Sequence, residues 1–361
     1  MHRTLGILFS GILFLVAAPG YGGWEQDWEQ TVKAAKEEGK VVVSSSPGTV
    51  VRDVLTQPFE KKFGIKVQHS GGSPNKLVSR VRLERAAGKY LWDVVVQGTT
   101  TAITSFKPMG VLDPIEPALI LPEVKDPKHW LEGKLWFSEK DRVNLLMGLA
   151  TRPGLAVNSN LVKTDQFKSY QDLLDPKWTG KMVVGRDPKI AGASQAQFLF
   201  LYLHKDLGPE YIRALFNQKI TMSGSDDQAL SWLGQGKMYI MIGPPETNTM
   251  DRLSRGVPIG LVPPPQMREG SYLSPGPATL MLLNRAPHPN AARVYINWIL
   301  SREGQIEYAR ATNVPSLRVD MPPDDAPSWR KPRPGYIDGY TEEAMAGRKK
   351  MLAFLKTVPA Q

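Results

Sequence analysis

The feature that most constrains the fold is a regular alternation of short apolar strands with helical stretches in the first hundred residues. Apolar runs at 41–43, 65–67 and 93–96 are separated by segments with helical spacing of apolar residues, at 51–63 and 77–87. Glycine follows each helical segment, at a position where it commonly ends a helix. Strands joined by helices pair in parallel, and helices cover both faces of their sheet. This part of the chain is therefore predicted to be an α/β unit.

A second α/β unit is predicted after the proline- and tryptophan-rich stretch 108–137. A strand at 181–184 leads into an apolar helix near 196–203, and a helix at 227–233 precedes a strand at 238–242. The 361 residues exceed the roughly 250–300 at which a single hydrophobic core stops growing. We therefore expect two lobes with a cleft between them, which is a common position for a ligand pocket.

The remaining segments indicate how the two units are joined. Leu155–Asn158 and 257–262, which runs into a triple proline, are predicted to be the connectors, so that the lobes close about a double hinge. A strand at 279–283 and a helix at 289–300 are expected to return to the first unit. A surface tail that ends in a helix at 342–355 completes the prediction.

The amino-terminal segment predicts export. Arg3 precedes an apolar run at 5–18, which is too short to span a bilayer as a helix and is followed by small and turn residues. These features are typical of a secretory signal peptide, which we place at 1–22. No cysteine follows the run, so the mature chain cannot carry a lipid on an amino-terminal cysteine. We expect a product that is free in a bacterial periplasm.

Composition and charge exclude several classes of function. The chain has no cysteine, which removes disulfides, thiolate metal sites and cysteine nucleophiles. Lys and Arg outnumber Asp and Glu by 45 to 35, which favours anionic partners. The basic residues form only short runs without interleaved aromatic residues, so nucleic-acid binding is not expected. The histidines lack a paired metal-ligand spacing, and we expect no metal and no cofactor.

Five separated segments resemble stretches of the bacterial solute-binding proteins of ABC importers, in the branch that includes the ferric-iron binders. These segments are EGKVVVSSS (38–46), FEKKFGIKV (59–67), RLERAAGKYLWDVVV (82–96), DLLDPKWTGKMVV (172–184) and APHPNAARVYINWILSREGQ (286–305). They occur in the order that the family has them, and together they cover most of the mature chain.

The resemblance implies a two-lobed α/β structure of the periplasmic-binding-protein type II fold, with a double-strand hinge. We expect lobe 1 to comprise 24–150 and 266–315, and lobe 2 to comprise 151–265 with the tail 316–361. A receptor of this kind closes on a small-molecule solute and presents it to an ABC permease in the inner membrane. We expect it to be a monomer.

The same resemblance argues against a ferric ion as the solute. Iron binders of the family carry a histidine just after the first strand, a glutamate after the third, and adjacent tyrosines in the second lobe. The corresponding positions here are Ser46 and Pro47, Gln97 and Gly98, and 243–248, and no two tyrosines are adjacent. Ferric ion prefers anionic oxygen ligands. A ferric-iron-binding importer component is kept as an alternative.

Candidate ligand-binding residues lie in the loops that follow the strands of lobe 1, because ligands of open α/β sheets bind beyond the carboxyl ends of the strands. Small hydroxyl residues and glycine in these loops let backbone amides approach a ligand, and helix amino termini suit a carboxylate, phosphate or phosphonate. The same residue types also make turns and helix caps, so both roles stay open. The candidates are Ser44, Ser45, Ser46, Ser70, Gly71, Ser73, Gln97, Gly98 and Thr99.

Lobe 2 offers a smaller set of candidates. They are Arg186, Ser194, Glu246, Asn248 and Tyr272. The guanidinium of Arg186 could bind an anion in a bidentate manner, or it could pair with Asp187 at the surface. Glu246 or Asn248 could meet a hydroxyl or amine of the ligand, and Tyr272 could close over it.

These patterns favour binding over catalysis. The sequence has no G-x-S-x-G, H-E-x-x-H, P-loop or G-x-G-x-x-G signature. We therefore predict the substrate-binding component of an ABC importer, which captures a small anionic organic solute such as a carboxylate, phosphate or phosphonate. A periplasmic sensor and an enzyme on the same fold are the remaining alternatives.

Overall fold

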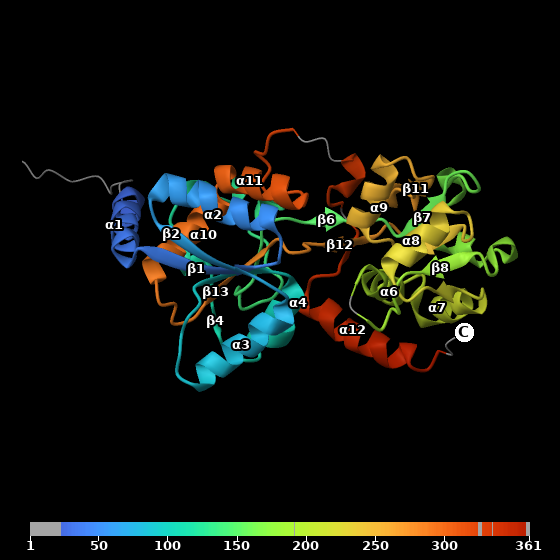
Figure 1. Cartoon of the computed structure of the whole chain (residues 1–361), viewed down its shortest axis with the longest axis horizontal. Coiled ribbons are helices and arrows are strands. Elements are labelled where there is room, and N and C mark those ends of the chain that lie inside the picture. Colours follow the sequence, from blue (N-terminus) through green and yellow to red (C-terminus); the bar gives the residue numbers. More distant parts are fainter. Residues whose placement is uncertain (1–22, 191, 324–326, 334, 359–361) are drawn as a thin grey trace, which may run out of the picture.

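The computed structural model describes residues 23–190, 192–323, 327–333 and 335–358. Figure 1 shows two lobes that lie side by side along the long axis of the molecule. The signal peptide predicted at 1–22 lies outside the described residues. Within the described ranges, no helix is both long and apolar enough to cross a membrane.

The sheet of lobe 1 contains the strands that the alternation pattern predicts. In spatial order it consists of β2 (Lys66–Gly71), β1 (Lys40–Ser45), β3 (Val94–Gln97), β13 (Thr279–Leu283) and β4 (Leu112–Asp113), with β5 (Leu145–Leu146) paired to β13. The first three strands pair in parallel, as predicted. The late strand β13 returns to this sheet, also as predicted, and lies antiparallel to β3.

Helices cover both faces of this sheet because the side chains of β1 alternate between two apolar clusters. Val41 and Val43 lie in one cluster with residues of α1, α2, α10 and α11, and Val42 lies in the other with residues of α3. The left-handed Gly64 ends α2 and donates its amide to the carbonyl of Glu60. The helices of lobe 1 are α1 (Gly23–Glu38), α2 (Thr49–Phe63), α3 (Pro74–Ala86), α4 (Thr99–Thr101), α5 (Pro122–Lys125), α10 (Pro289–Leu300) and α11 (Arg302–Thr312).

The sheet of lobe 2 is also mixed. In spatial order it consists of β11 (Ile259–Leu261), β7 (Leu155–Asn158), β10 (Ile240–Ile242), β8 (Met182–Val184) and β9 (Thr221–Met222). Strands β8, β9 and β10 are parallel, whereas β7 is antiparallel to both of its neighbours. The helices of lobe 2 are α6 (Ala193–Leu203), α7 (Gly208–Asn217), α8 (Asp226–Gly234), α9 (Glu246–Ser254) and α12 (Glu342–Leu355).

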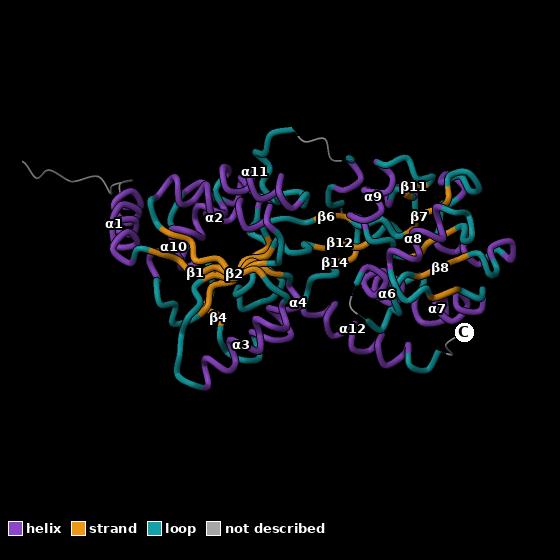
Figure 2. Tube along the Cα trace, in the orientation of Figure 1, coloured by secondary structure: helices purple, strands orange, loops and turns teal. Residues whose placement is uncertain are grey.

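The connectors predicted from the sequence are wrong in position. Leu155–Asn158 and most of 257–262 form β7 and β11, which pair with each other inside the sheet of lobe 2. The chain instead crosses between the lobes at β6 (Ala150–Thr151) and β12 (Tyr272–Ser274), which pair antiparallel, with β14 (Ile337–Asp338) beside β12 (Figure 2). A short apolar run suits a connector and a strand equally well by sequence, and here strand pairing buries all of β7.

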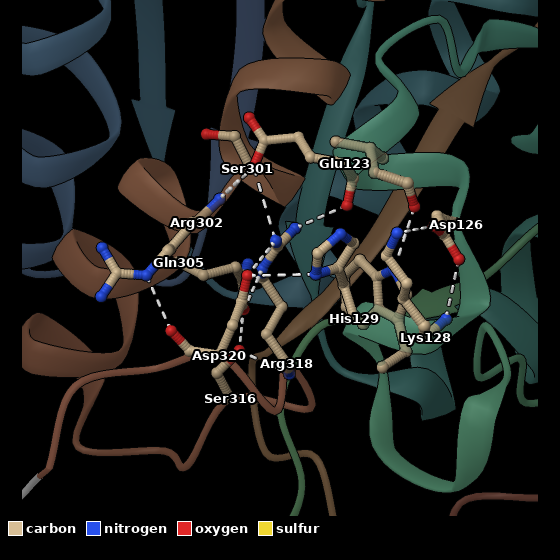
Figure 3. Close-up of polar contacts among 12 residues, drawn as sticks. Glu123, Asp126, Lys128, His129, Ser301, Arg302, Gln305, Ser316, Arg318 and Asp320 are labelled. Carbon is tan, nitrogen blue, oxygen red and sulfur yellow. Dashed lines mark hydrogen bonds and ion pairs between the residues drawn. The ribbon is translucent and has the colours of Figure 1, made fainter.

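The tail begins against lobe 1 rather than lobe 2. Leu317 lies in the main core of lobe 1, and the buried guanidinium of Arg318 holds Asp320 and two backbone carbonyls there (Figure 3). Met267, by contrast, packs in the core of lobe 2. We therefore propose that lobe 1 ends near 320 and that the 266–271 segment belongs to lobe 2.

The last helix, α12, contacts both lobes, as its position between them in Figure 1 indicates. Its Met351 and Leu355 are buried in the core of lobe 2. At its other end, Glu342 Oε1 lies 2.6 Å from Lys107 Nζ of lobe 1, and Asp141 Oδ2 lies 2.7 Å from the same nitrogen. Partial burial opposes the charge of Lys107, but these carboxylates outweigh it and raise the pKa of the ammonium group.

Candidate functional site

A cleft of about 460 Å³ lies between the two lobes. It receives residues from α3 and α4 of lobe 1, from α6 of lobe 2, from the hinge strands β12 and β14, and from α12. The residues that line it are Ser73, Pro74, Asn75, Val78, Thr100, Thr101, Thr104, Ser105, Gly192, Gln195, Ala196, Leu199, Phe200, Tyr272, Leu273, Ser274, Ile337, Gly339, Met345 and Arg348.

The wall from lobe 1 is rich in hydroxyl groups. Ser73 and Pro74 begin α3, and the side chain of Ser73 makes no capping hydrogen bond, so it faces solvent. Thr100 and Thr104 follow at the start of the neighbouring helix and are exposed, although the hydroxyl of Thr104 donates to the carbonyl of Thr100 at 2.7 Å. Hydroxyl groups can donate hydrogen bonds to an oxyanion, so this wall suits an anion.

The wall from lobe 2 and the floor are mainly apolar. Helix α6 contributes Leu199 and Phe200, and Phe200 stacks at 6.3 Å between ring centroids on Tyr272 of the hinge strand β12. Burial raises the pKa of Tyr272 to about 12. The phenol is therefore protonated at neutral pH, and Tyr272 contributes no negative charge to the cleft.

Arg348 of α12 is the charged group of the cleft. Among the described residues that line it, no other side chain is ionised at neutral pH. The guanidinium is half-buried, and burial lowers its pKa. It makes no hydrogen bond or ion pair with any residue that the structure describes, and its Nε is fully shielded from solvent. A half-buried guanidinium without a partner is costly, since its solvation is reduced and nothing compensates for it.

Sequence reasoning missed Arg348. In the sequence it begins a run of basic residues with Lys349 and Lys350, which is typical of a solvated helix face. Only the packing of α12 against α6 and lobe 1 turns this one residue of the run toward the cleft. No pattern within the run distinguishes it from its neighbours.

The predicted loops of lobe 1 do come together at the carboxyl ends of β1, β2 and β3. Ser44 Oγ donates to the carbonyl of Ser70, and the hydroxyl of Ser46 lies 3.4 Å from Gln97 Oε1. Gln97 Nε2 in turn approaches the carbonyl of Gly72. These groups therefore bind one another. Of the predicted residues in lobe 1, Ser73 lines the cleft, whereas Ser44, Ser45, Gln97 and Thr99 are buried beside it.

Two of these loops pass other backbone at a glycine, and the contact is tight at Gly98. A Cβ at Gly98 would lie 3.2 Å from the carbonyl oxygen of Gly276, and a Cβ at Gly71 would lie 3.4 Å from the Cα of Pro47. Thr99 accepts a hydrogen bond from Asn144 at 3.4 Å. These predicted residues thus hold the loops in place.

Ser45 and His69 form a contact that resembles a nucleophile and its base. Ser45 Oγ lies 2.7 Å from His69 Nε2, and the hydroxyl donates to the carbonyl of Ser46. Burial, and then the charge of Arg52, lowers the pKa of His69. No carboxylate orients the ring within the described residues, and Ser45 is 1% exposed. The pair therefore lacks the access and the third group that an activated serine requires.

The predicted residues of lobe 2 are dispersed. Arg186 approaches Asp226 at 3.7 Å rather than Asp187, which pairs with Lys189. Its side chain is half exposed, and its Cδ is 4.0 Å from a Cβ built at Gly192 of the cleft. Asn248 donates to Asp227 at the surface.

Two further predicted residues of lobe 2 differ in their surroundings. Tyr272 lines the cleft from the hinge, as described above. Ser194 is 1% exposed, and its hydroxyl finds no hydrogen-bond partner in the described part of the chain. Ser194 lies in the first turn of α6, next to Gly192 and Gln195 of the cleft wall.

Glu246 is held between two arginines at the hinge and is not free to meet a ligand. Its carboxylate lies 2.5 Å from Arg152 Nη1 and 2.6 Å from Arg330 Nε, and the residue is 9% exposed. Arg330 also donates to Asn313 of lobe 1 at 2.8 Å. This ion-pair network therefore links the two lobes. Sequence reasoning missed both arginines because they come from segments distant in the sequence.

The family model of bacterial extracellular solute-binding proteins matches residues 55–333 of this chain. The chain belongs to this family. The match covers most of both lobes and the hinge strands β6 and β12 of this solute-binding protein. Of the residues that line the cleft, Ile337, Gly339, Met345 and Arg348 lie beyond the matched region.

The curated relatives of this solute-binding protein are distant. Iron uptake protein A1 of Synechocystis sp. is 23% identical over 148 residues, which cover 41% of this chain and 38% of that protein. A periplasmic protein of Salmonella typhimurium named for 2-aminoethylphosphonate binding is 25% identical over 170 residues, or 46% of this chain and 50% of that protein. The chain thus spans half or less of the length of these relatives.

Solved structures support the fold of this solute-binding protein over nearly its whole length. Iron-bound HitA from Pseudomonas aeruginosa has a TM-score of 0.62 at 20% identity, covering 89% of this chain and 99% of that one. AfuA from Actinobacillus pleuropneumoniae, with fructose-6-phosphate bound, has a TM-score of 0.60 at 18% identity, covering 88% and 99%. The predicted two-lobed type II fold is confirmed.

Proposed function

We propose that this chain is the periplasmic solute-binding component of an ABC importer and that it holds a small organic anion in the cleft between its lobes. The observation that carries the proposal is the unpaired guanidinium of Arg348 in a cleft whose described lining has no carboxylate. An anion that reaches this group supplies the charge-assisted hydrogen bonds that the protein itself does not.

The surroundings of Arg348 favour the same type of ligand. The first turn of α6, at the cleft wall of lobe 2, has backbone amides without an intrahelical partner, and these suit an anion. Ser73, Thr100 and Ser105 add hydroxyl groups that can donate to an oxyanion. Because the groups come from both lobes, a bound anion favours the closed arrangement over the open one, and its binding energy drives closure. Arg186 and Ser194, which lie beside the cleft, are proposed to join the contacts on closure.

Cationic solutes fit the cleft less well. Relatives are named for iron uptake and for spermidine and putrescine binding, and both cargoes are cations that need carboxylate or phenolate partners. No group of three His, Asp or Glu side chains that could hold a metal occurs within the described residues. The phenol of Tyr272 is protonated, and Glu246 is already neutralised by its arginines. Other relatives are named for a phosphonate or have a sugar phosphate bound, and the negative charge of such ligands matches Arg348 better than a cation does.

The rest of the proposal follows from the family and the amino-terminal segment. The chain is exported by a signal peptide at 1–22, is free of a lipid anchor, acts as a monomer and passes its solute unchanged to a permease in the inner membrane.

Calorimetric titration tests the proposal. We expect the protein to bind at least one of 2-aminoethylphosphonate and fructose 6-phosphate, and not to bind spermidine. In Arg348→Met the affinity for the anion should fall by at least about tenfold, since a hydrogen bond to a charged group contributes roughly 1.5–3 kcal/mol.

The matched control is Lys349→Met, which removes an exposed cation from the next position of α12. It should change the affinity by less than about twofold, because long-range attraction between exposed charges is screened by salt. Binding of spermidine or ferric ion in place of the anions, or equal losses in the two variants, would falsify the proposal.

A further inference from the structure

We infer that the organic anion carries an apolar body, aliphatic or aromatic, which lies against the wall of lobe 2 while its charged end contacts Arg348. This inference rests on the proposed function and names the class of solute more closely. It follows from the unequal chemistry of the two walls of the cleft.

Most of the hydroxyl groups of the cleft come from the wall of lobe 1, although Pro74 and Val78 also lie in it. The opposite side is largely apolar, and its polar side chains include Gln195, Ser274 and Arg348. Ser73, Asn75, Thr100, Thr104 and Ser105 all come from lobe 1. The apolar lining residues that face them from lobe 2, from the hinge and from α12 are Ala196, Leu199, Phe200, Leu273, Ile337 and Met345. Ile337 and Met345 are partly exposed, so a ligand in the cleft can remove apolar surface from water there.

The position of the charge agrees with an amphipathic ligand. Arg348 and Met345 are one turn apart on the same face of α12, so the cation and the apolar surface are immediate neighbours. Met345 Sδ lies 3.9 Å from the hydroxyl of Thr100, at the boundary between the two walls. A carboxylate or phosphonate at Arg348 therefore places the atoms attached to it between a hydroxyl wall and an apolar wall.

A ligand that is polar all round fits this cleft poorly. The described side chains of the lobe 2 wall offer one amide group, that of Gln195, which already donates to the carbonyl of Lys189 at 3.3 Å. Sugar hydroxyls placed against Leu199 and Ile337 would lose their water without gaining partners. The volume of about 460 Å³ lies in the range of roughly 300–1,000 Å³ that takes drug-sized molecules, so a two-carbon anion would leave the partly exposed side chains of Ile337 and Met345 in water.

A series of matched probes tests the inference on the full-length mature protein by calorimetry. We expect 3-phenylpropionate to bind at least about tenfold more tightly than acetate, because its ring removes apolar surface from water. We expect 3-phenylpropionamide, which has the same body without the charge, to bind at least about tenfold more weakly than 3-phenylpropionate. Fructose 6-phosphate should bind more weakly than 3-phenylpropionate.

Variants locate the apolar contact. Ile337→Thr and, independently, Met345→Gln should reduce the ratio of the 3-phenylpropionate and acetate affinities by at least about threefold. Val319→Thr, at an exposed valine outside the cleft, should leave the ratio unchanged. Melting curves measured by circular dichroism show whether each variant is folded. If one of the two cleft variants fails to fold, the affinity ratio of the other tests the inference.

The outcomes separate this inference from the proposed function. Tighter binding of fructose 6-phosphate than of 3-phenylpropionate, together with a loss in Arg348→Met, would overturn the apolar body and leave an anion receptor. If neither Ile337→Thr nor Met345→Gln changes the ratio of the 3-phenylpropionate and acetate affinities, the apolar body is overturned in the same way. Equal binding of 3-phenylpropionate and its amide would instead contradict the anion-binding function itself.

Discussion

Replacing Arg318 by Met is expected to lower the free energy of unfolding by about 3–5 kcal/mol, the usual cost of removing one partner from a buried ion pair. Arg318 is 3% exposed and packs over the ring of Trp130. Its Nε and Nη2 lie 2.9 Å and 2.7 Å from the two carboxylate oxygens of Asp320, as Figure 3 shows. Its Nη1 donates to the carbonyls of Glu123 and Leu300, at 3.0 Å each. Methionine fills the space but removes the donor from both backbone carbonyls, and leaves the carboxylate of Asp320 with only His129 Nδ1, at 3.3 Å, and solvent.

Urea unfolding followed by circular dichroism measures the change. Arg310→Met is the control, since the side chain of Arg310 is 72% exposed and pairs with Glu307 at 3.7 Å. We expect a loss below about 0.5 kcal/mol there, as for most exposed ion pairs. Equal losses in the two variants would mean that Arg318 does not fix the tail to lobe 1.

The ion pair between Arg318 and Asp320 predicts that the stability of the protein depends on pH. Hydrogen bonds from Arg318 hold the pKa of Asp320 below its ordinary value. A carboxylate with a lowered folded-state pKa stabilises the fold above its unfolded pKa of about 3.9, and this stabilisation is lost as the pH falls through the folded value. The stability difference between the wild type and Arg318→Met should therefore be full at pH 7 and shrink below about pH 4. If the stability difference between the two proteins does not change with pH, the loss in Arg318→Met comes from packing alone.

The second large effect is expected at the junction of α10 and α11, where Gly304→Ala should destabilise the protein by about 3 kcal/mol, near the upper end for overpacking. A Cβ at Gly304 would lie 2.1 Å from the carbonyl oxygen of Trp298 and 2.7 Å from the Cα of Ile299. Both atoms belong to the backbone of α10 and cannot move aside as a side chain can. The intrinsic helix preference of alanine acts in the opposite direction, by up to about 1 kcal/mol.

Gly347→Ala is the matched control for this substitution. Gly347 is also helical and tightly packed, with a Cβ contact of 2.6 Å, but the atom it would meet is the terminal Cδ2 of Leu203. That side chain can rotate away, so we expect a change below about 1 kcal/mol. Thermal unfolding compares the two variants directly, and a larger loss for Gly347→Ala would contradict the assignment of strain to the α10–α11 backbone.

The elements of the fold were predictable from the sequence because each of them is marked locally. The spacing of apolar residues and a terminal glycine such as Gly64 indicate helices, and the short valine runs before Ser44 and Gln97 indicate the strands of lobe 1. The hinge was misplaced because β6 and β12 are two and three residues long and carry no such mark. Their role depends on pairing across more than a hundred residues, which periodicity does not report.

The candidate site was predictable only in part, for the same physical reason. The general position beyond the strand ends follows from topology, and Ser73 and Tyr272 do line the cleft. The charged group of the cleft, Arg348, comes instead from a helix near the end of the described chain, and its exposure to the cleft depends on how α12 packs. A sequence reader sees that it is basic, but not that it lacks a partner.

The way α12 spans the molecule bears on how the receptor exchanges between its two states. Its apolar face is fixed in one lobe by Met351 and Leu355, whereas it meets the other lobe through the Lys107–Glu342 ion pair. Separation of the lobes must break that pair, yet Lys107 keeps Asp141 on its own lobe. Helix α12 thus links the two lobes through an ion pair that breaks when they separate. Higher ionic strength weakens this ion pair, so it should increase the population of the open state and speed the release of solute.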